Sequence, residues 1–223
     1  MKALFILFSL MLLAACGSGG PPPPDWKTDS ADLVERYKKH ALLGETTLAE
    51  RYFQQAITAT GGAGRVVDTA RLWLVRCATQ RAMLIDDRCT EYRELARIEP
   101  DPADHAYYQF LTLDWDAVDV ARLPSQHREL LRAPVAKRPE TLERVADPLA
   151  RLLEASLLVM RQESDSRVLS VATETASSRG WRQPLLTYLR LQENQAAAIG
   201  NAAEQARLVQ RIQLVEKSLA NAP

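Results

Sequence analysis

The sequence has few of the residues and motifs that identify most enzymes. Its three histidines, His40, His105 and His127, lie far apart. It contains no Gly-Lys-Ser phosphate-binding loop, no Gly-x-Ser-x-Gly nucleophile motif and no His-Glu-x-x-His zinc motif. Its cysteines form no Cys-x-x-Cys pair of the kind found in zinc and redox sites. The sequence therefore predicts no catalytic residue, no cofactor and no metal ligand, and it indicates no small-molecule substrate.

An excess of charge of one sign is also missing. Lysine and arginine together number 28, and aspartate and glutamate together also number 28. The two kinds of charge are interleaved along the chain, whereas a protein that binds nucleic acid needs a clustered basic surface. This balance argues against a nucleic-acid partner.

Glycine and aromatic residues are scarce, and residues that favour helix are abundant. Apolar residues recur with helical spacing, and no convincing alternating strand pattern is present. The sequence therefore predicts a single all-α domain over residues 28–223. The expected helices are 29–43, 46–60, 63–84, 87–99, 105–113, 117–123, 125–132, 149–161, 165–179, 184–199 and 201–220. Gly44 and Gly180 suit helix C-caps, and Asp147-Pro148 is a strong helix start.

The N-terminus reads as an export signal. Lys2 is followed by an apolar run from Ala3 to Leu13 that is interrupted only by Ser9, and this run is too short to span a membrane. The next residues, Leu13-Ala14-Ala15-Cys16, resemble the lipobox of bacterial lipoproteins. The resemblance implies a signal peptide over residues 1–15 and a lipidated N-terminus at Cys16. The alternative is an ordinary signal peptide with an accidental cysteine at its boundary.

Lipidation would decide where the protein works, because two or three acyl chains anchor a protein stably in a membrane. Residues 16–27 form a tether, in which a Gly/Ser segment and four prolines precede the domain. The residue after the cysteine is Gly17 rather than aspartate. By resemblance to enterobacterial lipoprotein sorting, Gly17 favours the outer membrane, with the domain facing the periplasm.

Two further cysteines, Cys77 and Cys89, would share the oxidising compartment that export implies. A cysteine pair persists there as a disulfide, and only one pairing is available. The rival interpretations are a metal site and a reactive thiol. We predict a Cys77–Cys89 disulfide.

A weak repeat accompanies this pair. Residues 44–56, with a small residue at Ala49 and an aromatic residue at Phe53, resemble the tail of a tetratricopeptide repeat. Forty residues further along, Cys77, Cys89 and Ala96 match Tyr37, Ala49 and Ala56. The resemblance implies stacked antiparallel helical hairpins, an α-solenoid, in which the cysteines lie where two helices approach most closely.

One segment resembles a catalytic motif. Residues 156–164 resemble the first motif of Slt-type lytic transglycosylases, in which the glutamate corresponding to Glu163 is the general acid and base. The Gly-Leu-Met-Gln segment that follows in that family is absent here. The other interpretation is a solvated side chain at a helix end, and we expect Glu163 at the surface, outside any deep cleft.

Two functions follow from these observations. The first is a lipid-anchored periplasmic scaffold or accessory protein of the cell envelope, not an enzyme, that binds a protein partner through its helical-repeat surface. The alternative is a peptidoglycan-cleaving lytic enzyme that uses Glu163.

Overall fold

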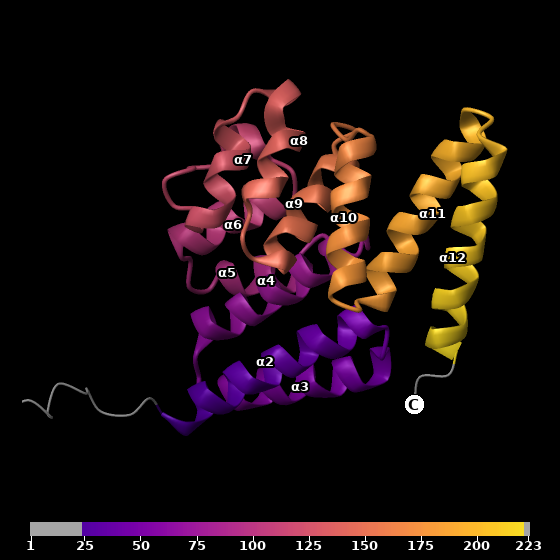
Figure 1. Cartoon of the computed structure of the whole chain (residues 1–223). Helices are drawn as coiled ribbons and strands as arrows, with labels where there is room; N and C mark the ends of the chain where they lie inside the picture. The colour runs from indigo at the N-terminus through magenta and orange to yellow at the C-terminus, as the bar shows by residue number, and fades with distance from the viewer. Residues whose placement is uncertain (1–23, 221–223) are drawn as a thin grey trace, which may run out of the picture.

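The computed structural model describes residues 24–220, and this part of the chain is all-α. Most consecutive helices pack side by side, with the α2–α3 hairpin at the base of Figure 1 and the α11–α12 hairpin at its right. The eleven α-helices of the described residues are α2 (Asp25–Leu43), α3 (Thr46–Gly62), α4 (Val66–Ala82), α5 (Thr90–Ala96), α6 (Pro102–Leu111), α7 (Arg128–Arg132), α8 (Arg138–Thr141), α9 (Pro148–Met160), α10 (Ser166–Ser178), α11 (Arg182–Ala198) and α12 (Ala202–Ala220). None of these helices is both long and apolar enough to cross a membrane.

Several helix boundaries follow from local side-chain chemistry. The Asp147 carboxylate accepts a hydrogen bond from the backbone N–H of Ala150 at 2.7 Å, which caps α9 as predicted. Asp165 caps α10 in the same way. Gly44 ends α2 with a φ of +82°, a left-handed conformation that glycine adopts without steric cost. These boundaries were predictable because each depends on residues within one turn of the helix.

Several predicted helix bounds are wrong: α4 spans Val66–Ala82 and not 63–84, α5 spans Thr90–Ala96 and not 87–99, and α6 begins at Pro102 and not at His105. Helix α2 begins at Asp25 and not at Asp29 or Ser30, so the first helix includes the last residues assigned to the tether. The α2–α3 packing supports this early start, since the buried Ser30 hydroxyl accepts a hydrogen bond from Thr60 of α3. The helix predicted over 117–123 is absent. There the Asp119 carboxylate accepts from the backbone N–H of Ala121 at 3.1 Å, a local turn that competes with helix.

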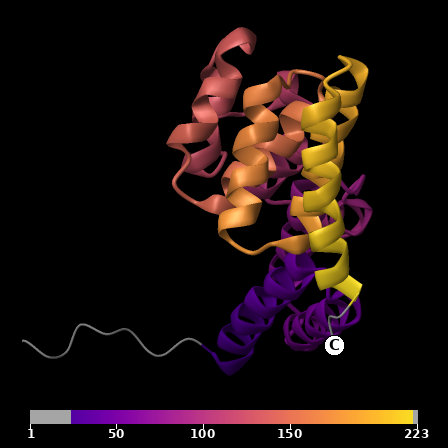
Figure 2. The ribbon, with the colours of Figure 1, turned by 45° about the vertical axis from the view of Figure 1, so that its right-hand side comes forward.

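The main core lies around α4 and α9, which pack against each other although they are far apart in sequence. Most of α9 is buried, including Leu152, Leu157 and Leu158. Figure 2 shows the indigo α2–α3 hairpin at the bottom and the yellow α12 at the right, with the lower end of α12 beside the hairpin. A smaller core of Leu189, Ala196 and Leu208 holds α11 against α12.

The other main packing is between sequence neighbours: α2 on α3, α4 on α5, α9 on α10, α10 on α11 and α11 on α12. The hairpins are unequal, because α5 has seven residues where α3 has 17. The all-α prediction is confirmed, and the 40-residue repeat and the solenoid stay predictions.

The C-terminal α11–α12 hairpin contacts the N-terminal α2–α3 hairpin. Arg182, at the start of α11, donates hydrogen bonds to the carbonyls of Leu43 and Ser218 and forms an ion pair with Glu45 at 2.9 Å. Leu219 of α12 lies so close to Gly44 that a Cβ atom there would come within 2.6 Å of it. These contacts join the end of α12 to the turn between α2 and α3.

Candidate functional site

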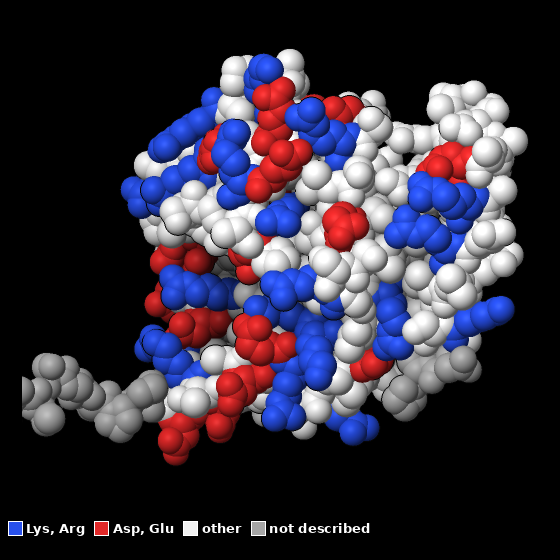
Figure 3. All heavy atoms as spheres, viewed as in Figure 1, with Lys and Arg blue, Asp and Glu red and all other residues white. Residues whose placement is uncertain are grey.

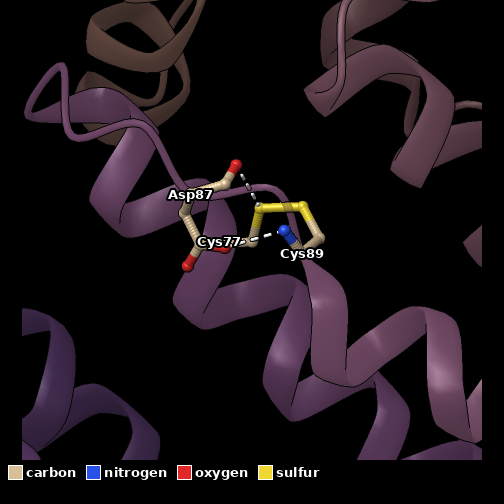
Figure 4. A group of neighbouring side chains, drawn as sticks. All are labelled: Cys77, Asp87 and Cys89. Atoms are coloured by element: carbon tan, nitrogen blue, oxygen red, sulfur yellow. Dashed lines mark hydrogen bonds between the residues drawn. A yellow bond between two sulfur atoms is a disulfide. The ribbon is translucent and has the colours of Figure 1, made fainter.

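The predicted disulfide joins Cys77, in the middle of α4, to Cys89, at the residue before α5 (Figure 4). The two Cα atoms are 5.4 Å apart and both residues are buried. The ligand atoms of Cys77, Asp87 and Cys89 lie within 4.8 Å of one another. Because the two sulfurs are bonded to each other, they are not thiolates, and one carboxylate alone does not make a metal site.

A cavity of about 590 Å³, here called the arginine pocket, lies beside this disulfide-bonded loop. Arg81 at the end of α4, Arg88 in the loop and Arg93 on α5 line it, together with one acid, Asp86. Three positive charges against one negative charge give the lining a net charge of +2. The pocket is therefore an electropositive site in a chain whose overall charges balance.

The rest of the lining comes from Leu84, just after α4, and from residues at the C-terminal ends of α6 and α9. Leu84, Leu113 and Met160 supply apolar surface, and Tyr108 and Thr112 bring hydroxyl groups. The pocket thus combines positive charge with apolar surface, as ligand-binding sites commonly do.

Helices α4, α6 and α9 end close to this pocket, and each is followed by a non-glycine residue with a positive φ angle. Leu84, Leu113 and Gln162 have φ values of +61°, +67° and +60°, and Cys89 has +49°. Left-handed backbone costs a residue with a Cβ atom about 1 kcal/mol or more. Leu84 and Leu113 both line the pocket. Strained backbone clusters at functional sites, so this end of the molecule is the strongest candidate for one.

Arg81 is a buried cation whose hydrogen-bond and ion-pair partners only weakly offset the cost of burying its charge. The residue is only 5 % exposed, and its Nε donates to the Asp87 carbonyl at 2.9 Å. Its Nη1 donates to the thioether sulfur of Met160, a weak acceptor, and Asp86 approaches Nη2 only to 3.4 Å. The Asp86 side chain is 71 % exposed, so water screens this pair. Burial lowers the pKa of Arg81, and the nearby carboxylates offset this only in part.

Glu163 lies next to this region, and it is not the solvated surface side chain that we predicted. Its side chain is 12 % exposed and not solvated, because two arginines enclose it. Its Oε2 is 2.6 Å from Nη1 of Arg138, and its Oε1 is 2.7 Å from Nε of Arg161. Both guanidinium groups also lie over the ring of Trp115, at 4.9 and 4.4 Å from its centroid.

These contacts determine the charge of Glu163. Burial alone would raise the pKa of Glu163, but the hydrogen bonds from Arg138 and Arg161 outweigh it and lower the pKa below the ordinary value of 4.5. A carboxyl group in this setting is ionised at neutral pH. It therefore holds no proton to donate to a glycosidic oxygen.

A second buried pair, His127 and Glu154, was not predicted from the sequence. Nδ1 of His127 is 2.9 Å from Oε1 of Glu154, and both side chains are 1 % exposed. Phe110 and Tyr107 stack on the imidazole. Burial raises the pKa of Glu154, and the hydrogen bond to His127 opposes this. The two residues are 27 positions apart, so no spacing rule connects them.

His127 also lines a cavity of about 300 Å³. In the described part of the chain its hydrogen-bond partners are Glu154 and Gln126. Thr79, which lines the same cavity, donates its hydroxyl hydrogen to the Val75 carbonyl. Because no hydroxyl or thiol nucleophile is bonded to His127, the pair acts here as a link between the α7 region and α9.

Cys16 and Gly17 lie outside the described residues, so lipidation stays a prediction. The interleaving of charge is visible on the face in Figure 3, where basic and acidic side chains alternate over much of the surface.

Compared with protein-family models, with curated proteins and with solved structures, the chain matches none.

Proposed function

We propose that this chain is a lipid-anchored, non-enzymatic binding protein of the bacterial cell envelope. In this proposal Cys16 carries the lipid in the outer membrane, and the helical domain faces the periplasm and binds an envelope protein. The lipobox resemblance supports the anchor, and the Cys77–Cys89 disulfide is compatible with an exported protein.

The observation that carries the binding function is the arginine pocket. It has the size of a ligand site, positive charge, apolar surface and strained backbone, and it contains no pair of groups suited to proton transfer. Such a site is suited to holding a ligand and not to transforming one.

The same proposal includes a repeat arrangement of the helical hairpins. We infer that the α2–α3 and α4–α5 hairpins are tetratricopeptide-like units of a short α-solenoid. The consecutive packing of helices supports this, and a stacked array would offer a partner one continuous surface.

The alternative, a peptidoglycan-cleaving enzyme, depends on a protonated Glu163. The two arginines that enclose Glu163 favour the ionised form, and Glu163 is not among the residues that line the arginine pocket or the His127 cavity. A general acid needs the opposite environment, one that raises its pKa.

One experiment separates the two functions. Purified mature protein is incubated with sacculi, and soluble muropeptides are measured for the wild type and for Glu163→Gln. In parallel, the tagged protein is cross-linked in intact cells and its partners are identified after solubilisation. We expect a specific envelope partner and no muropeptide release. Release that is lost in Glu163→Gln would overturn the binding proposal.

A further inference from the structure

The buried cation of the arginine pocket has only weak anionic partners within the described residues. Buried charges in proteins are normally paired, and an isolated one is costly. Arg81 is buried, yet its acceptors are a carbonyl, a thioether and a carboxylate at 3.4 Å on an exposed side chain. A carboxylate bound in the pocket would add negative charge at the Nη atoms, where Asp86 approaches only to 3.4 Å.

The other two arginines of the pocket are available to the same ligand. The Arg88 side chain is 83 % exposed, and its nearest acid, Asp86, is 3.9 Å away. Arg93 forms no ion pair with any residue between 24 and 220. A planar guanidinium matches a carboxylate with two parallel hydrogen bonds, so a carboxylate could take donors from more than one arginine.

The apolar wall restricts the ligand further. Leu84, Leu113 and Met160 would stay exposed to water if only a small hydrated anion such as phosphate bound. A ligand with an apolar group beside its carboxylate would cover this wall and gain from burying that surface. The C-terminal residue of a peptide, when its side chain is apolar, has this chemistry.

We propose that the arginine pocket binds the free C-terminal carboxylate of a peptide whose last side chain is apolar. The carboxylate lies against Arg81, with Arg88 and Arg93 at the entrance, and the last side chain packs on Leu84 and Met160. This inference rests on the proposed binding function and names the part of a partner that the pocket recognises.

The disulfide is part of this site. It ties the loop that carries Arg88 to the middle of α4, and the Cys89 backbone N–H donates to Asp87 at 2.7 Å. The Asp87 carbonyl in turn accepts from Nε of Arg81. The loop therefore helps to hold the buried guanidinium in place before a ligand binds, which reduces the entropy lost on binding.

The test is isothermal titration calorimetry of the full mature protein with three probes. These are the tripeptide acetyl-Gly-Ala-Leu as a free acid, the same tripeptide with a C-terminal amide, and inorganic phosphate. We expect the free acid to bind about tenfold or more tightly than the amide, since the amide cannot accept charge-assisted hydrogen bonds. We also expect phosphate to compete poorly.

Because the Arg88 and Arg93 side chains are exposed, replacing them tests the pocket without disturbing the fold. We expect Arg88→Gln and Arg93→Gln each to weaken binding of the free acid by about threefold to tenfold. Arg81→Met, which keeps an apolar chain at the buried position, should abolish binding while the thermal midpoint reports whether the fold persists. The matched control is Arg97→Gln, because Arg97 is 67 % exposed, pairs with Glu94 alone among residues 24–220 and does not line the pocket.

The inference is wrong if acid and amide bind equally, if phosphate competes as well as the peptide, or if the Arg88 and Arg93 variants bind like the control. If no probe binds but cross-linking still identifies an envelope partner, the inference fails and the proposed function stands. Release of muropeptides would overturn the proposed function itself.

Discussion

Loss of the Cys77–Cys89 disulfide should destabilise the domain by about 3 kcal/mol. The bond closes a loop with a sequence separation of 12, and the chain-entropy relation assigns about 3 kcal/mol to a loop of that length. The test replaces both cysteines by alanine, because both side chains are buried and a serine hydroxyl would need a hydrogen-bond partner. In a domain of about 200 residues this loss corresponds to a fall in thermal midpoint of about 6–12 °C.

The assay is urea unfolding followed by helical circular dichroism, in a Cys16→Ser background so that only this cysteine pair is counted. We expect the oxidised protein and the double alanine variant to unfold with similar m values and different midpoints. Reductant should move the oxidised protein to the midpoint of the variant and should leave the variant unchanged. A difference below about 1 kcal/mol would contradict the loop-entropy argument, and two titratable thiols in denatured, unreduced protein would contradict the disulfide itself.

Three further predictions concern single positions. Glu163→Gln should lower the free energy of unfolding by about 2 kcal/mol, because two arginines lose their anionic partner. Since folding lowers the pKa of Glu163, the full difference from wild type is present above about pH 4.5 and disappears as the pH falls through the folded pKa. A constant difference in urea midpoint down to pH 2 would refute this. Cys16→Ala should leave the membrane fraction or remain unprocessed, as seen by cell fractionation, and a wild type that incorporates no labelled lipid precursor would refute the anchor. Gly44→Ala should lower the thermal midpoint more than Gly180→Ala, because both positions have positive φ but only Gly44 lies against Leu219; equal effects would show that the contact with α12 contributes nothing.

The sequence by itself determined the features whose causes lie within a few residues. Asp147 and Asp165 cap their helices, and Gly44 and Gly180 end theirs, because one side chain or one φ angle decides each boundary. The cysteine pair was predictable for another reason, since the predicted export and the presence of only two candidates leave one partner for Cys77.

Local patterns failed where a competing local turn or a distant residue decides the outcome. Periodicity placed a helix over 117–123, but the Asp119 side chain forms a turn there. The motif around Glu163 gave no sign of Arg138, which lies 25 residues earlier and determines the charge of the carboxyl group. The left-handed conformation of Leu113 was equally invisible, since helices are expected to end in that conformation at glycine or asparagine.

The tertiary structure alone assembled the arginine pocket. Arg81, Arg93, Tyr108 and Met160 come from four different helices, α4, α5, α6 and α9, and the packing of α5, α6 and α9 on α4 brings them together. Each residue taken singly looks like an ordinary surface or core residue in the sequence. The burial of Arg81 arises from which helices pack around it, and spacing along one chain segment does not encode that.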